Sequence, residues 1–122
     1  MILENIRLDI QSREIEGLTV LDATGEIDIY TAPEFKKAVD SVIASGQKHI
    51  VINMENVSYM DSSGFGMLLS ATKKVKPDGG SINLAACGSA IERMLRVTKL
   101  DSVFQIHPNV EEAIKSIKTV QQ

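Results

Sequence analysis

The chain has 122 residues, of which 43% are hydrophobic and 24% charged, a length and composition typical of one soluble globular domain. Its net charge of −3 and its aromatic content of only 4% argue against direct nucleic-acid binding, which needs a basic surface or aromatic stacking platforms. No apolar run approaches the roughly 18 to 20 residues of a transmembrane helix, and the first residues lack a secretory signal, so we expect a cytoplasmic protein without a membrane segment.

The first predicted elements are two strands of an antiparallel hairpin. Ile6, Leu8 and Ile10 alternate with polar residues, which is typical of a half-buried strand. The second strand is predicted from residue 18 to residue 24, after a turn over residues 14–17.

The first helix is predicted from a capping pattern. Thr31 and Glu34 are three residues apart with Pro33 in the first turn, which is typical of a helix start. Apolar residues then recur at helical spacing as far as Gly46, where the helix is expected to end.

A buried strand is predicted next, over His49 to Met54, followed by a loop over residues 56–59 and a second helix. Asp61 is the expected N-cap of this helix, with Met60 and Phe65 in the positions of a hydrophobic staple. In that register Ser62 and Ser63 are the first two helical residues, beside free backbone N–H groups that favour an anion.

The rest of the chain continues the alternation of strands and helices. Its expected elements are a strand over residues 82–86, a helix capped by Ser89 with Ile91, Leu95 and Thr98 inward, a strand over 103–107, and a helix capped by Asn109. The pattern predicts an α/β fold, a mixed sheet that opens with the hairpin and continues through β-α-β crossovers, packed with about four helices. We expect one domain over residues 1–122 with an ordered core of about 5–118, so that Met1 to Asn5 and Thr119 to Gln122 fray.

Several residues that often carry chemistry receive a structural interpretation here. The only cysteine, Cys87, excludes an internal disulfide and is expected to pack at a strand end. His49 and His107 flank predicted strands without partners at ligand spacing, so no metal and no cofactor is predicted.

The motif from Asp61 to Gly66 permits three interpretations. Catalysis by a serine needs a positioned base, and the motif lacks the hydrolase elbow, with only His107 able to share its edge of the sheet, so no enzyme is predicted. Helix capping alone would explain an aspartate and a serine. Capping alone does not explain the second serine or the two glycines within the helix. Each glycine lowers helix stability by about 1 kcal/mol relative to alanine, which suggests that another group approaches the helix closely there.

Two motifs resemble the STAS family, specifically the bacterial anti-sigma-factor antagonists. The first is Gly25-Glu26-Ile27-Asp28 followed by Thr31-Ala32, and the second runs from Val57 to Gly66. The resemblance continues through residues 84–89, Leu95, residues 100–104 and residues 111–113, with Phe65 where leucine is commoner in the family.

This resemblance implies a non-enzymatic binding module regulated by phosphorylation. Its partners would be an anti-sigma serine/threonine kinase with bound ATP or ADP, which it sequesters when unphosphorylated, and a serine phosphatase that resets it. Ser62 would be the phosphoacceptor, and the protein a monomer. The predicted partner-binding residues are Asp28, Ile29, Tyr30, Thr31, Asp61, Ser63, Gly64 and Met67.

A different use of the same fold stays open at this stage. The chain could be a STAS scaffold subunit of a stress-signalling assembly, or a soluble regulator of a membrane transport system. For Ile29 and Tyr30, simple loop packing is the alternative to partner contact.

Overall fold

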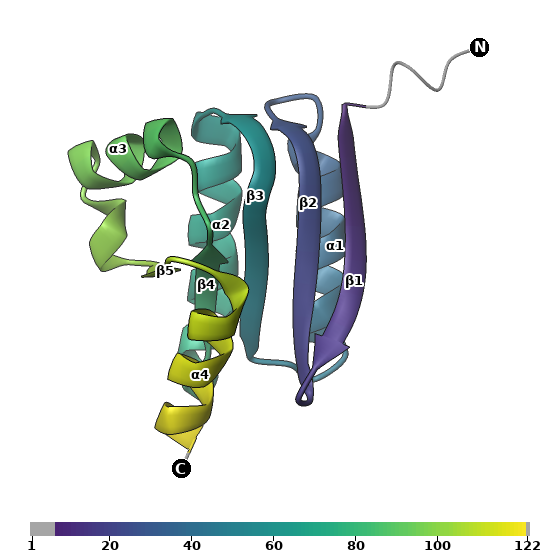
Figure 1. Cartoon of the computed structure of the whole chain (residues 1–122). Helices are drawn as coiled ribbons and strands as arrows, with labels where there is room; N and C mark the ends of the chain where they lie inside the picture. Colours follow the sequence, from purple (N-terminus) through teal and green to yellow (C-terminus); the bar gives the residue numbers. More distant parts are fainter. Residues whose placement is uncertain (1–6, 122) are drawn as a thin grey trace.

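The computed structural model describes residues 7–121, and these form one mixed sheet covered by helices on both faces (Figure 1). The strands are β1 (Leu8–Ile15), β2 (Leu18–Ile27), β3 (His49–Met60), β4 (Ser81–Ala85) and β5 (Gln105–His107). The helices are α1 (Ala32–Ala44), α2 (Ser62–Val75), α3 (Ser89–Val97) and α4 (Val110–Gln121), with short 3₁₀ segments η2 (Lys76–Asp78) and η3 (Leu100–Ser102). The predicted α/β fold is confirmed.

The strands lie in the order in which they occur in the chain. β1 and β2 form the predicted antiparallel hairpin, and each later pair of neighbours is parallel. Ile15 pairs with Leu18, so the turn is the two residues Glu16 and Gly17, both with positive φ. Such a turn matches the right-handed twist of the strands, which lets β1 continue further than expected.

Two apolar cores flank the sheet. The larger core lies between the sheet and α1, α2 and α3, and the smaller one lies under α4. Along β3, Ile50 and Ile52 belong to the larger core and Val51 to the smaller, as the two-residue period of a strand requires. Figure 1 shows α1 and α2 behind the sheet and α4 in front of it.

The predicted loop over residues 56–59 is wrong, because β3 continues to Met60. Val57 and Met60 are buried and pair with Gly25 and Ile27 of β2. The β2–β3 pairing contains two register shifts, which interrupt the regular alternation of buried and exposed residues. Both strands therefore extend by several residues beyond their predicted ends and bring the two sequence motifs to one edge of the sheet.

The predicted helix caps have different outcomes. Asp61 and Asn109 cap α2 and α4, because their Oδ1 atoms accept hydrogen bonds from Ser63 N at 2.9 Å and Glu112 N at 2.8 Å. Gly88 is the N-cap of α3, so Ser89 as a cap is wrong. Thr31 precedes α1 but makes no side-chain cap.

At the ends of the chain, the predicted strand residue Ile6 and the predicted fraying of Met1 to Asn5 and of Gln122 lie outside the described residues. α4 continues to Gln121, past the expected limit of about residue 118. Thr98, expected to point inward, is exposed and ends α3. Within residues 7–121, no helix is both long and apolar enough to cross a bilayer.

Candidate functional site

The candidate site lies where β2 and β3 end. Ile27 and Met60 are paired across these parallel strands, and Asp61 N donates to Ile27 O at 3.1 Å. Asp28 and Asp61 each follow one member of this pair. The two motifs, more than 30 residues apart in the sequence, therefore begin side by side at the carboxyl edge of the sheet.

Ser62 is exposed at the first position of α2. Asp61 adopts an extended backbone, and its carboxylate and its carbonyl accept hydrogen bonds from Ser63, Gly64 and Phe65. This cap holds the first turn in place while the Ser62 side chain points away from the core. Positive partial charge at a helix start also favours an anion there.

The two glycines of the motif have different roles. A Cβ on Gly64 would lie 2.6 Å from Met60 Cγ and 2.8 Å from Ile27 Cγ2, so the protein's own core approaches this position. A Cβ on Gly66 would meet no atom within 4 Å, and Gly66 is exposed. The missing side chain of Gly64 is thus a packing requirement of the fold, whereas the fold does not explain Gly66.

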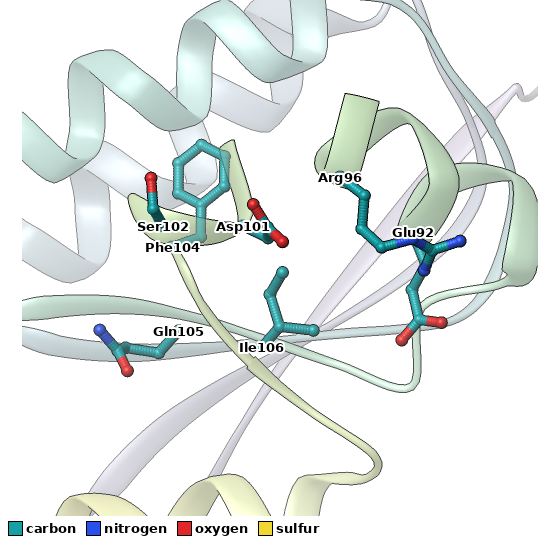
Figure 2. A pocket seen from close by; sticks show the side chains of 7 residues that line it. All are labelled: Glu92, Arg96, Asp101, Ser102, Phe104, Gln105 and Ile106. Atoms are coloured by element: carbon teal, nitrogen blue, oxygen red, sulfur yellow. The ribbon is translucent and has the colours of Figure 1, made fainter. Parts of the chain in front are cut away.

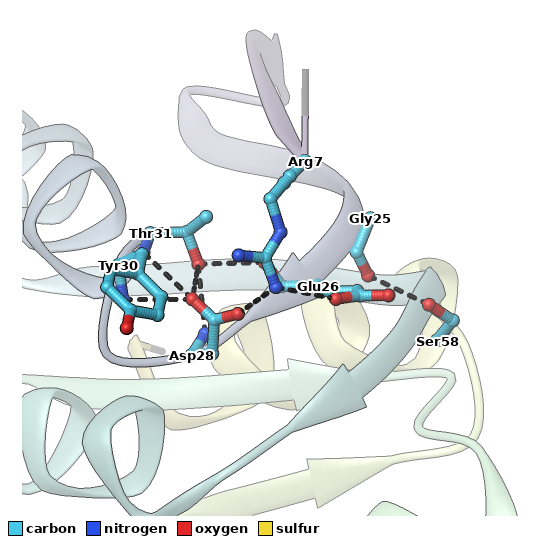
Figure 3. A network of polar contacts seen from close by, with 7 residues as sticks. All are labelled: Arg7, Gly25, Glu26, Asp28, Tyr30, Thr31 and Ser58. Carbon is cyan, nitrogen blue, oxygen red and sulfur yellow. Dashed lines mark hydrogen bonds and ion pairs between the residues drawn. The ribbon is translucent and has the colours of Figure 1, made fainter. Parts of the chain in front are cut away.

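Asp28 organises the loop after β2 (Figure 3). Its Oδ1 atom accepts hydrogen bonds from Tyr30 N at 2.9 Å and Thr31 N at 3.1 Å, and Thr31 Oγ1 donates to Glu26 O at 2.8 Å. Burial alone would raise the pKa of Asp28, but the Thr31 and Tyr30 N–H groups and the Arg7 guanidinium together hold that pKa below its ordinary value. Asp28 is therefore a buried, fully partnered carboxylate.

Arg7 is a member of this network that the sequence analysis missed. Its Nη2 atom pairs with Asp28 Oδ2 and, at 3.0 Å, with Glu26 Oε1. The guanidinium carbon also lies 5.9 Å from the centre of the Tyr30 ring. No local sequence signal could have found this residue, because only the β1–β2 register brings it beside Glu26.

The remaining predicted partner-binding residues separate into two groups. Ile29 and Tyr30 are 65% and 79% exposed, and Ser63 and Asp61 are partly exposed. Thr31 and Met67 are buried, with 7% and 8% of their surface exposed, and Gly64 is also buried. The exposed members of the predicted set are thus the tip of the loop after β2 and the first turn of α2, whereas Met67 packs in the core.

The histidines and the cysteine lie apart from this site. His49 Nδ1 contacts Ser81 Oγ at 2.8 Å, at the end of β3 opposite to Ser62, and His107 Nε2 donates to Asn83 Oδ1 at 3.0 Å. No hydrogen bond joins Ser62 to a histidine within residues 7–121. Cys87 packs partly against the larger core, and burial raises its pKa to about 12, so its thiol stays protonated.

A separate hollow of about 410 Å³ lies between α3, η3 and β5. Figure 2 shows Glu92 and Arg96 on one side of it and Phe104 and Ile106 on the other. Across the described part of the chain, no group of three metal-ligating side chains occurs in this hollow or elsewhere.

Comparison with known proteins agrees with this geometry. The chain is similar to the anti-sigma F factor antagonist of Paenibacillus polymyxa, at 27% identity over 116 residues that cover 94% of this chain and 99% of the relative. It is also similar to the anti-sigma-B factor antagonist of Staphylococcus aureus, at 26% identity over 106 residues, 87% of this chain and 98% of that one.

Among solved structures, an anti-sigma factor antagonist from Mycobacterium paratuberculosis superimposes with a TM-score of 0.84 at 27% identity, covering 91% of this chain and 94% of that chain. The family model described as the STAS domain matches residues 9–113. The two motifs at the sheet edge, the five-stranded mixed sheet and this match over most of the sequence lead to one assignment: the chain belongs to the STAS domain family.

Proposed function

We propose that this protein is an anti-sigma factor antagonist whose binding to an anti-sigma serine kinase is switched by phosphorylation of Ser62. Unphosphorylated, it sequesters the kinase in its ATP- or ADP-bound form and so frees a sigma factor. Phosphorylation releases the kinase, and a serine phosphatase restores the binding form. The names of the relatives support the first part of this proposal, and the exposed hydroxyl at the start of α2 supports the second.

The observation that carries the switch is the position of Ser62. A phosphoryl group there adds about −1.5 to −2 charges at a helix start, which favours anions, so the domain is expected to stay folded. The exposed side chain leaves a kinase free access to the hydroxyl. Phosphorylation is therefore expected to change the charge of the docking surface without changing the core.

The source of repulsion follows from the charges around the site. Asp28 is compensated by Arg7 and by backbone N–H groups, so it contributes little free negative charge. Asp61 makes no ion pair within residues 7–121 and is adjacent to Ser62. In a docked complex the phosphate would meet this carboxylate and would also lose its hydration, a combined cost of about 3 kcal/mol or more, which is over a hundredfold in affinity.

The test uses the purified anti-sigma serine kinase encoded in the same genome. Wild type, Ser62→Ala and Ser62→Asp are compared for phosphorylation, mapped by peptide mass spectrometry, and for binding, measured by calorimetry with ATP or ADP present. We expect Ser62→Ala to resist phosphorylation and to bind permanently, and the phosphorylated wild type to bind over a hundredfold more weakly, as a cost of about 3 kcal/mol implies.

Ser63→Ala is the matched control, because Ser63 is the neighbouring hydroxyl and is only partly exposed. It should still be phosphorylated at Ser62. Modification at Ser63, or equal affinity of the phosphorylated and unphosphorylated proteins, would contradict the switch. A preference for a multimeric STAS assembly over the kinase would favour a scaffold role.

A further inference from the structure

Arg7 directly precedes β1, and its side chain reaches the loop that follows β2 (Figure 3). Its backbone is fixed, because Glu26 N donates to Arg7 O at 2.8 Å and a Cβ on Gly25 would come within 2.0 Å of the same oxygen. Only glycine, with φ of 123°, allows this approach. The guanidinium therefore starts from a rigid position and extends toward Asp28.

The loop tip beyond Asp28 exposes two neighbouring large side chains. Ile29 and Tyr30 are adjacent, and 65% and 79% of their surfaces are exposed. Neighbouring large apolar side chains that remain exposed commonly mark an interaction site. The Tyr30 ring nevertheless has a partner in its own chain, the guanidinium of Arg7, with the 5.9 Å separation of a cation–π contact.

We propose that Arg7 is a positioning residue that orders Tyr30 as an aromatic anchor for the docking partner. This inference rests on the proposed function. Arg7 acts twice, since its pairing with Asp28 fixes the loop backbone and its contact with the ring fixes the side chain. An anchor that is already ordered loses less conformational freedom on binding.

The same arrangement indicates which surface of the partner would fit. Arg7 compensates the Asp28 charge, so the loop tip presents an aliphatic and an aromatic side chain rather than a carboxylate. The complementary surface on the kinase is an apolar pocket that accepts the Tyr30 ring, with a polar rim for its hydroxyl. Phosphorylation of Ser62 would act beside this anchor without removing it.

The first experiment needs no partner. The chain has two tyrosines and no tryptophan, so Tyr59→Phe leaves Tyr30 as the single fluorophore. Time-resolved anisotropy of that variant is compared with and without Arg7→Ala. We expect the amplitude of fast ring motion to rise about twofold without Arg7, with Arg7→Lys in between. Arg7→Ala also removes an ion-pair partner of the buried Asp28 and should lower the thermal midpoint, so all three proteins are compared well below that temperature. Equal Tyr30 motion in all three proteins would overturn the inference, whatever the partner does.

The second experiment measures kinase affinity. We expect Arg7→Ala to weaken binding about fivefold and Tyr30→Ala at least as much, with the double variant no weaker than Tyr30→Ala alone, because both changes remove the same anchor. Glu26→Gln removes the other ion pair of Arg7 and should change affinity less than about twofold.

The outcomes separate the two proposals. If wild type binds and the effects of Arg7→Ala and Tyr30→Ala simply add, the positioning role is wrong and the proposed function stands. If wild type does not bind the kinase at all, the proposed function is wrong and the docking role of Arg7 is wrong with it. The anisotropy result then still decides whether Arg7 orders Tyr30.

Discussion

Gly64 and Gly66 occupy the same helix at a spacing of two residues, yet their surroundings differ completely. Gly64 faces Met60 and Ile27, and the carboxyl ends of β2 and β3 pack against α2 only because this position lacks a side chain. Gly66 faces open space. A helical glycine that the fold does not require lowers stability, and at Gly66 this agrees with the proposed close approach of a partner.

Alanine at each glycine separates these roles. Gly66→Ala should raise the free energy of unfolding by about 1 kcal/mol through helix propensity. Gly64→Ala should lower it, because overpacking costs about 1–3 kcal/mol and outweighs that gain. Urea unfolding of both variants measures the two changes. We further expect Gly66→Ala, although more stable, to bind the kinase more weakly than wild type. A destabilised Gly66→Ala, or a stabilised Gly64→Ala, would contradict this assignment.

At the scale of elements, the N-terminus of α2 combines a structural and an electrostatic role in one residue. Asp61 caps the helix through its Oδ1 atom, and its carboxylate is the negative charge adjacent to Ser62. Serine at an N-cap accepts the same hydrogen bond without a charge. The two roles can therefore be separated by substitution.

Asp61→Ala should destabilise the protein by about 1 kcal/mol through loss of the cap, whereas Asp61→Ser should stay within a few tenths of a kcal/mol of wild type. If the carboxylate supplies part of the repulsion, phosphorylation of Asp61→Ser will reduce kinase affinity by a smaller factor than phosphorylation of wild type. Thermal unfolding and calorimetry with the phosphorylated proteins measure both effects. An unchanged ratio of affinities would assign the repulsion to groups on the kinase.

The elements differ in how far their sequences determine them. The start of α2 was predictable because Asp61 is both the cap and the boundary of an apolar periodicity, and α4 was predictable from Asn109 for the same reason. The extension of β3 was not predictable, because Glu55 and Asn56 are residues typical of a loop. They lie in the strand because β3 pairs with β2 through register shifts. That pairing involves residues about 30 positions away, which local periodicity does not detect.

In the candidate site, too, some features were predictable from the local sequence and others depend on contacts between distant residues. The exposed serine at a helix start followed from local pattern alone. The assignment of Gly64 to partner contact did not anticipate Met60 and Ile27, and nothing near Arg7 in the sequence points to Asp28. Contacts across strands depend on register, so these roles become visible only when the whole sheet is assembled.

At the scale of the whole molecule, a chain of polar groups crosses the sheet under α4. His49 contacts Ser81, Asn83 donates to Ser81 Oγ at 2.9 Å, and His107 donates to Asn83. Burial lowers the pKa of both histidines, assisted at His49 by Lys48 and opposed at His107 by Glu112. Both imidazoles are therefore neutral in the folded protein near neutral pH.

This network predicts how stability depends on pH. Because each folded-state pKa lies below the ordinary value of 6.5, the unfolded chain binds more protons than the folded one as the pH falls past that value. The free energy of unfolding should be constant above about pH 7.5 and should decline as the pH falls below about 6.5. Asp28 changes stability in the same direction at lower pH, because its pKa is lower in the folded protein than its ordinary value of 3.8. Its ionised form stabilises the fold above pH 3.8, and this contribution is lost as the pH falls through the pKa that Asp28 has in the folded protein.

Urea unfolding at intervals between about pH 8 and pH 5 measures the first decline. His49→Gln keeps a polar side chain at that position but cannot titrate, so its stability should fall less steeply over this range, whatever its absolute stability. His107→Gln is the matched second variant, and its stability should also fall less steeply than that of wild type. A wild-type stability that is flat or rises as the pH falls from about 7 to 5 would mean that the histidines accept protons without disturbing the packing of α4 on the sheet.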